Sequence, residues 1–223
     1  AFMNGYGYSE VINYSFTSPN SADILGLGDD DGGQRFVRIK NPLTEDQSVM
    51  RITLVYGLLE TMKKNINNGS FDLKFFEKGK VFIPEAGDGE LPREGERLGA
   101  LITGSRYDQL WHSKGVQVDF YDVKGCLENL LSMLRIEGVR FAPSVDIKCL
   151  HPGRACRVFV GEKEAGIVGE VHPDVLERMD IKRRAMVFEV DLDLLADRFT
   201  GAVVFKEVKK FPAVYRDVAF LVG

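Results

Sequence analysis

Residues 157–171 read RVFVGEKEAGIVGEV, and this stretch indicates how the chain folds. Two apolar runs flank the polar segment GEKE at residues 161–164. Runs of β-forming residues that are separated by a few residues including glycine are typical of a β-hairpin. The stretch therefore predicts two adjacent antiparallel strands, at residues 157–160 and 165–171.

Strands are also predicted along most of the remaining chain. Alternating apolar and polar residues predict half-buried strands at residues 10–16 and 35–40. Further strands are predicted near residues 72–84, 96–104, 139–142 and 185–190. Because the strands are joined mostly by turns, an antiparallel α+β domain is favoured over a doubly wound parallel sheet.

The clearest predicted helix covers residues 53–68. Its apolar residues recur at helical spacing and form one stripe, which comprises Leu54, Val55, Leu58, Leu59, Met62 and Ile66. A second helix is predicted at about 121–135, and short helices are predicted after residue 18 and at 172–179. The expected fold is therefore an antiparallel sheet flanked by helices.

The charge balance bears on possible partners. The 223 residues include 29 Lys plus Arg and 33 Asp plus Glu, which gives a formal net charge of -4. Phosphate contacts supply much of nucleic-acid affinity, so this balance argues against a protein that binds RNA or DNA by itself. A local basic face remains an alternative, but scattered residues that face water are the favoured interpretation. The basic residues concerned are Lys182, Arg183, Arg184, Lys206, Lys209 and Lys210.

The sequence also bears on the cellular compartment. No apolar run approaches the ~18 residues of a membrane span, and the first residues do not resemble a signal peptide. Three cysteines cannot all pair, and no disulfide spacing stands out among Cys126, Cys149 and Cys156. We therefore expect a soluble protein of the reducing cytoplasm with no membrane partner.

Four residues have side chains that suit zinc, namely Cys149, His151, Cys156 and His172. Their spacing, C-x-H-x4-C followed by a distant histidine, matches no structural zinc pattern. A turn-stabilising role is favoured for His172, because it precedes a proline at a predicted helix start. Zinc binding is thus the disfavoured interpretation.

Three carboxylates, Asp119, Asp122 and Glu128, have side chains that suit magnesium. Carboxylates at a helix start are stabilised by the helix dipole, so capping is the favoured role for the first two. Walker and Gly-x-Gly-x-x-Gly motifs are absent, and no Gly-x-Ser-x-Gly serine accompanies the three histidines: His112, His151 and His172. The residues taken alone therefore indicate no enzyme.

Six strings of residues resemble the beta subunit of bacterial phenylalanyl-tRNA synthetase, in the family's order. They are GYSEVINYSF (7–16), NPLTEDQSVMRITLVYGLLETMKKNINNG (41–69), FFEKGKVF (75–82), VDFYDVKGCLENLL (118–131), HPGRACRVFVGEKEAGIVGEVHP (151–173) and KFPAVYRDVAFLV (210–222). The resemblance covers nearly the whole chain. It implies a core like a class II synthetase catalytic domain at residues 1–198. A linker and the first strand of a truncated anticodon-binding domain would follow at 199–223.

The resemblance extends to the family's catalytic alpha subunit and implies that this core has lost its catalysis. Ile83 and Leu194 stand where the alpha subunit has arginines that contact substrate and ATP, and Glu189 and Asp191 replace close-approach glycines. Fixed arginines stabilise the negative charge that develops during adenylate formation. The resemblance therefore implies no catalytic, cofactor-binding or metal-binding residue here, and assigns ATP and magnesium to the whole enzyme.

The resemblance also implies a structural role in a heterotetramer with the alpha subunit, and contact with tRNA(Phe) through the whole enzyme. Residues 8–16 resemble the strand that builds subunit interfaces in class II synthetases, so we expect Phe2, Tyr6 and Tyr8 at that interface. Two alternatives remain open: a free-standing paralogue that binds an amino acid or nucleotide in a remnant pocket, and a domain that contacts tRNA directly. A simpler interpretation of the strand is that its apolar residues fill the domain's own core: Val11, Tyr14 and Phe16.

Overall fold

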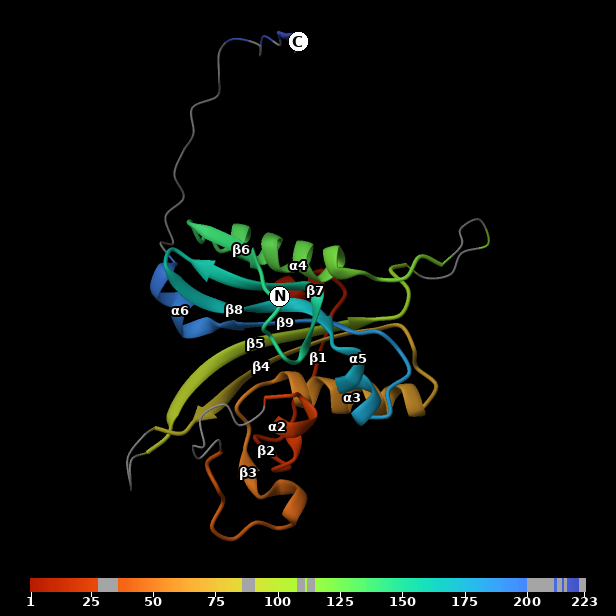
Figure 1. Ribbon diagram of the computed structural model, residues 1–223, viewed down its shortest axis with the longest axis vertical. Helices are drawn as coiled ribbons and strands as arrows, with labels where there is room; N and C mark the ends of the chain where they lie inside the picture. The colour runs from red at the N-terminus through yellow and green to blue at the C-terminus, as the bar shows by residue number, and fades with distance from the viewer. Residues whose placement is uncertain are drawn as a thin grey trace.

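A seven-stranded sheet organises the protein (Figure 1). The computed structural model describes residues 1–27, 36–85, 91–107, 111, 115–199, 211, 214 and 216–220. Within these residues the strand order is β1-β4-β5-β9-β8-β7-β6, and β2 and β3 form a separate two-stranded sheet. Because β5 and β9 are neighbours in the sheet but distant in sequence, the sheet joins the two halves of the chain.

The described pairs of the large sheet are antiparallel, except that β1 runs parallel to β4. Its strands are β1 Ser9–Glu10, β4 Leu73–Ile83, β5 Arg93–Thr103, β6 Val139–Pro143, β7 Leu150–Val160, β8 Lys163–Val171 and β9 Met186–Asp191. The small sheet pairs β2 (Phe16–Thr17) antiparallel with β3 (Val49–Met50). The mostly antiparallel α+β architecture and the hairpin predicted from the sequence are confirmed.

Helices cover both faces of the sheet (Figure 1). One face carries α1 (Phe2–Gly5), α4 (Phe120–Met133) and α6 (Leu192–Arg198). The other face carries α2 (Ser21–Ile24), α3 (Val55–Asn67) and α5 (Pro173–Arg178), and a 3-10 turn, η1, covers Glu45–Gln47. None of the described helices is both long enough and apolar enough to cross a membrane.

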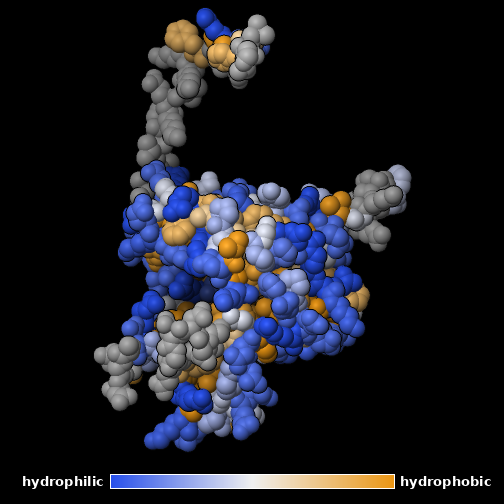
Figure 2. Space-filling view, in the orientation of Figure 1, coloured by the Kyte–Doolittle hydropathy of each residue, from blue (hydrophilic) through white to orange (hydrophobic). Residues whose placement is uncertain are grey.

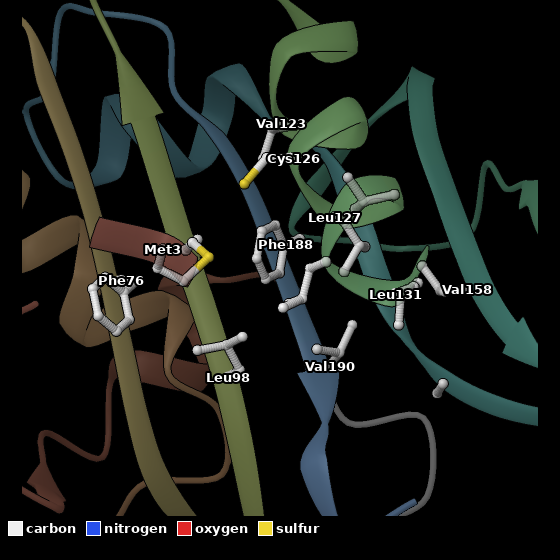
Figure 3. Close-up of a cluster of buried hydrophobic side chains, with 14 of the residues drawn as sticks. Met3, Phe76, Leu98, Val123, Cys126, Leu127, Leu131, Val158, Phe188 and Val190 are labelled. Carbon is white, nitrogen blue, oxygen red and sulfur yellow. The ribbon is translucent and has the colours of Figure 1, made fainter. Parts of the chain in front are cut away.

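The central strand β9 contributes to both helix layers, because successive side chains of a strand point to opposite faces. Met186, Phe188 and Val190 lie in the cluster beneath α4 that Figure 3 shows. Val187, between them, lies in the cluster beneath α3. All four side chains have 0% exposure, so β9 is covered on both faces.

The two long helices lie where the sequence predicts them. α3 buries five of the six stripe residues, Leu54, Val55, Leu58, Leu59 and Met62, and Ile66 is partly buried. At the start of α4 the Asp119 carboxylate accepts a hydrogen bond from the Tyr121 N–H (2.8 Å), and Asp122 accepts one from the Asp119 N–H (2.8 Å). The capping role of these two carboxylates is confirmed.

Two predicted strands are wrong. Residues 10–16 do not form one strand, because β1 ends at Glu10 and β2 begins at Phe16. The Asn13 N–H between them donates to a side-chain oxygen of Glu77 (3.3 Å), so a backbone ladder is not continued. Of residues 35–40, Arg35 lies outside the described residues and Arg38 makes one isolated bridge, to Val49.

Candidate functional site

Ile83 and Leu194, the positions predicted to replace catalytic arginines, lie on opposite faces of the sheet. Ile83 ends β4 and packs, partly buried, against the cluster beneath α3. Leu194 lies in the first turn of α6, packs against the cluster beneath α4, and donates its backbone N–H to Asp191 (2.9 Å). The structure therefore does not bring the two side chains together.

Charged side chains on the sheet face beneath α3 have partners within the protein. Arg97 Nη1 lies 3.3 Å from Asp191 Oδ2 on the neighbouring strand. Glu189 Oε2 accepts hydrogen bonds from the Leu54 N–H (2.6 Å) and the Thr53 hydroxyl (2.8 Å). Burial raises the pKa of Glu189, although these two bonds oppose the rise. The carboxylate thereby satisfies the Leu54 amide at the start of α3, where backbone N–H groups have no partner within the helix.

Helix α3 lies directly on this face. A Cβ built on Gly99 of β5 would stand 3.0 Å from Leu58 Cδ1 and 3.1 Å from Leu54 Cβ. The missing side chain thus permits a close helix-to-strand contact. The apolar side chains of Leu54 and Leu58 therefore occupy the space above Gly99.

A buried ion pair joins β4 to the residues that precede α3. Arg51 Nη1 lies 2.5 Å from Glu77 Oε1, and the two side chains are 8% and 2% exposed. Arg51 Nε also donates to the Lys80 carbonyl (2.8 Å). A Cβ on Gly79 would stand 2.2 Å from Arg51 Nη2, so glycine is required for the arginine to lie there. Buried charges need such pairing, because their desolvation is costly.

The segment between β1 and β2 has an inverted pattern of burial. Ile12, Tyr14 and Phe16 are 92%, 75% and 42% exposed, whereas the residues between them, Asn13 and Ser15, are partly buried. The rings of Tyr14 and Phe16 stack with centroids 6.5 Å apart. A contiguous row of exposed apolar side chains is typical of an interaction surface. The simpler interpretation, in which Val11, Tyr14 and Phe16 fill the core, is wrong for Tyr14 and Phe16, whereas Val11 is partly buried and packs against the cluster beneath α3.

Phe2, Tyr6 and Tyr8, predicted at a subunit interface, differ in exposure. Tyr8 is 4% exposed, lies in the cluster beneath α4 and bonds through its hydroxyl to Cys126, and burial raises the pKa of its phenol. Tyr6 is 41% exposed and stacks on Phe2 with centroids 4.8 Å apart. The Tyr8 side chain therefore belongs to the core. The role of Phe2, Tyr6 and Tyr8 at an interface stays a prediction.

A cavity of about 650 Å³ opens beside the same segment. Its wall includes Asn13 and Arg51, and two side chains of α3, Tyr56 and Glu60. Side chains of both charges line it, Asp46 and Lys64 among them. This mixture does not select a single class of ligand.

The two cysteines considered for zinc are separated by the sheet. Cys149 lies beneath α3 and Cys156 beneath α4, on opposite faces of the sheet. Burial raises the pKa of the Cys149 thiol to about 12, which disfavours the thiolate that a metal requires. His172 Nδ1 accepts a hydrogen bond from the Asp174 N–H (3.2 Å), so this histidine caps α5, and its ring lies 6.5 Å from that of His151. His112 lies outside the described residues.

The residues considered for magnesium have structural partners. Arg106 Nη2 donates to Asp119 (3.1 Å) and to Asp122 (3.0 Å). Glu128 pairs with Lys124, one turn earlier on α4. Within the described ranges, no three His, Cys, Asp or Glu side chains are grouped so that they could hold a metal ion.

The basic residues considered for a nucleic-acid surface are partly engaged. Arg184 makes two hydrogen bonds to the Glu170 carboxylate, at 2.7 and 2.6 Å. The Arg183 guanidinium lies 4.3 Å from the centre of the Phe71 ring. Lys206, Lys209 and Lys210 lie outside the described residues. Arg183 and Arg184 therefore contribute to the fold as well as to surface charge.

The fold is that of a class II aminoacyl-tRNA synthetase-like domain. A crystal structure of pyrrolysyl-tRNA synthetase from Desulfitobacterium hafniense matches it with a TM-score of 0.65 and 13% sequence identity. The match covers 87% of this chain and 64% of that one. At this identity the likeness concerns the fold alone.

The sequence narrows this class to one family. Residues 1–192 match the family described as the phenylalanyl tRNA synthetase beta chain CLM domain, and the chain belongs to this family. The phenylalanine–tRNA ligase beta subunits of Syntrophus aciditrophicus (strain SB) and Geobacter metallireducens (strain ATCC 53774 / DSM 7210 / GS-15) are 50% and 40% identical to it over 220 residues. Each match covers 99% of this chain and 27% of the relative's length. The resemblance found in the sequence is confirmed.

Three residues beside the exposed segment, Asn13, Arg51 and Glu77, had no predicted role. The signal in the sequence was the polar Asn13 between Ile12 and Tyr14, which is unusual for a strand side that packs inward. Two charged residues were a second signal: Arg51 lies shortly before a predicted helix, and Glu77 lies within a predicted strand. Their pairing depends on the fold and is not visible in the sequence.

Proposed function

We propose that this chain is the non-catalytic core of a phenylalanine–tRNA ligase beta subunit and that its role is assembly. It binds the catalytic alpha subunit and supports aminoacylation of tRNA(Phe) by the whole enzyme in the cytoplasm. ATP and magnesium serve that enzyme at the alpha subunit. The chain spans 27% of the length of the relatives it matches, so these activities are proposed for the larger protein.

The inverted segment 11–16 is the observation that carries this proposal. The face in Figure 2 is mostly hydrophilic, with separate hydrophobic patches. Against such a surface, Ile12 at 92% and Tyr14 at 75% exposure are large apolar side chains without cover from the described residues. Burial of apolar surface is the main favourable term in protein association, so a subunit that covers this row gains affinity from it.

The sheet face beneath α3 supports a role without catalysis. Arg97 on this face and Arg51 beside it lie against the carboxylates of Asp191 and Glu77. Adenylate formation requires cationic groups aimed at phosphate, and an arginine held by a carboxylate does not supply that field. The close contact of α3 at Gly99 leaves little room for a nucleotide there.

Assembly and activity can be tested together. Tagged full-length beta subunit is expressed with and without the catalytic alpha subunit, and phenylalanine-dependent pyrophosphate exchange is measured. We expect the alpha subunit to co-purify and exchange to require it. Exchange by this chain alone, free of other synthetases, would contradict the proposal.

The alternative, a paralogue that binds an amino acid or nucleotide in a remnant pocket, predicts a different result. Titration calorimetry of this chain with phenylalanine and with ATP would then give saturable heat. The assembly proposal expects no saturable heat from either compound, because the sheet face is covered by α3.

A further inference from the structure

Asn13 makes three hydrogen bonds from the middle of the exposed segment. Its Nδ2 donates to Glu77 Oε2 (2.7 Å), and its backbone N–H donates to Glu77 Oε1 (3.3 Å). Its Oδ1 accepts from the Thr61 hydroxyl on α3 (2.7 Å). A single side chain thereby ties the segment both to β4 and to α3.

The anchor for these bonds is rigid. Glu77 is 2% exposed, and its Oε1 also binds Arg51 Nη1. Hydrogen bonds to a buried charged group are stronger than those between neutral groups. A carboxylate also needs several donors when it is removed from water, so Glu77 and Asn13 stabilise one another.

The bonds of Asn13 fix which side of the segment faces outward. In an extended chain, neighbouring side chains point in opposite directions, so an inward Asn13 requires an outward Ile12 and Tyr14. The segment is also held at Ser15, whose carbonyl accepts a hydrogen bond from the Arg51 N–H (2.9 Å). A slip by one residue would turn Ile12 and Tyr14 inward and remove the apolar row from the surface.

We propose that Asn13 is a positioning residue for subunit assembly. It holds the segment 11–16 so that Ile12, Tyr14 and Phe16 are displayed before the partner arrives. The inference rests on the proposed function, because the partner is the catalytic alpha subunit proposed above. Holding a segment in its bound conformation lowers the entropy cost of association, so loss of Asn13 weakens assembly without removing any contacting side chain.

The test uses the full-length beta subunit and its alpha subunit. The Kd of assembly is measured by titration calorimetry for Asn13→Ala, Thr61→Val and Tyr14→Glu. Asn65→Ala is the matched control, because the Asn65 side-chain amide donates to the Thr61 carbonyl (2.9 Å) within α3 and, among the described residues, makes no hydrogen bond to the segment 11–16. Hydrogen exchange of residues 11–16 in the free beta subunit reports whether the segment is held.

We expect Asn13→Ala to raise the Kd about tenfold, because the variant loses two side-chain hydrogen bonds, one of them to a buried charge. Exchange at residues 11–16 rises in the same variant, whereas exchange within α3 does not change. Thr61→Val removes one bond and leaves the ion pair intact, so it raises the Kd about threefold. Asn65→Ala leaves the Kd unchanged.

The outcomes separate the inference from the proposed function. If Tyr14→Glu weakens assembly but Asn13→Ala and Thr61→Val do not, Asn13 does not position the segment, and the docking surface stands. If none of the three weakens assembly, the interface lies elsewhere and the inference falls, whereas failure of the unmodified beta subunit to bind the alpha subunit would overturn the proposed function. If Asn13→Ala does not fold, Thr61→Val decides, and an unchanged Kd in that variant overturns the inference.

Discussion

The central strand β9 and the segment 11–16, which follows the edge strand β1, arrange their side chains in opposite ways. β9 buries apolar residues on both faces, with Phe188 at 0% exposure. The segment turns Asn13 toward the protein and leaves Ile12 at 92% exposure. The first arrangement stabilises the fold by burial, whereas the second is held by a buried ion pair. Buried polar contacts that hold apolar side chains outward are consistent with a surface that binds a partner.

Replacement of Glu77 should have the largest effect, because it removes the anchor of the segment. Glu77→Ala leaves the Arg51 guanidinium buried without its partner, which costs about 3–5 kcal/mol of unfolding free energy. Glu77→Gln, which keeps the shape, should lose less. Urea unfolding of the 223-residue chain measures both. A loss below about 1 kcal/mol for Glu77→Ala would mean that the pair is not an anchor.

Stabilisation by burial of apolar side chains is tested at α3. Leu58 is 0% exposed and lies against Gly99, so Leu58→Ala should cost about 2–5 kcal/mol. The same urea experiment measures it, and assembly with the alpha subunit should keep its Kd while the domain is folded. A cost below about half a kcal/mol at both Leu58 and Leu59 would show that the stripe is exposed.

The sequence predicted α3 and the hairpin because their signals are local. A stripe with helical spacing, such as Leu54, Leu58 and Met62, determines both the element and its buried face. The segment 11–16 was misjudged because Val11 and Ile12 are both apolar, so alternation alone did not fix which side faces inward. That choice depends on Glu77, which is 64 residues from Asn13 along the chain. The separation of Ile83 from Leu194 likewise depends on the faces of the assembled sheet.

A smaller effect on the free energy of unfolding is expected at Glu170, a buried carboxylate that pairs with exposed arginines. Burial opposes ionisation of Glu170, but Arg184 and Arg154 outweigh it and lower its pKa. The lowered pKa means that the stabilisation is present above the unfolded pKa and is lost as the pH falls through the folded pKa. Arg184→Met should therefore cost about 1 kcal/mol at pH 7 and less at about pH 3.5.

Urea unfolding of the unmodified chain and of Arg184→Met, at both pH values, measures this difference. The control is Arg183→Met, since Arg183 lies over the Phe71 ring. Its cost should not depend on pH in this range. An equal cost of Arg184→Met at both pH values would contradict the assignment.

The smallest effect is expected at the end of the chain. Phe211, Val214, Val218 and Phe220 are 85%, 80%, 70% and 84% exposed. Unlike Ile12 and Tyr14, they follow the predicted boundary at residue 198. Removal of residues 200–223 should change the unfolding free energy by less than about 0.5 kcal/mol. A larger loss in the same urea experiment would place this part within the domain.

The central claim is that the segment 11–16 is the docking surface for the catalytic alpha subunit. Hydrogen exchange of the full-length beta subunit, with and without the alpha subunit, tests it most directly. The opposite edge of the sheet, β6, is the internal control. We expect added protection at residues 11–16 and none at β6. Unchanged exchange at residues 11–16 in the fully formed complex would contradict the claim.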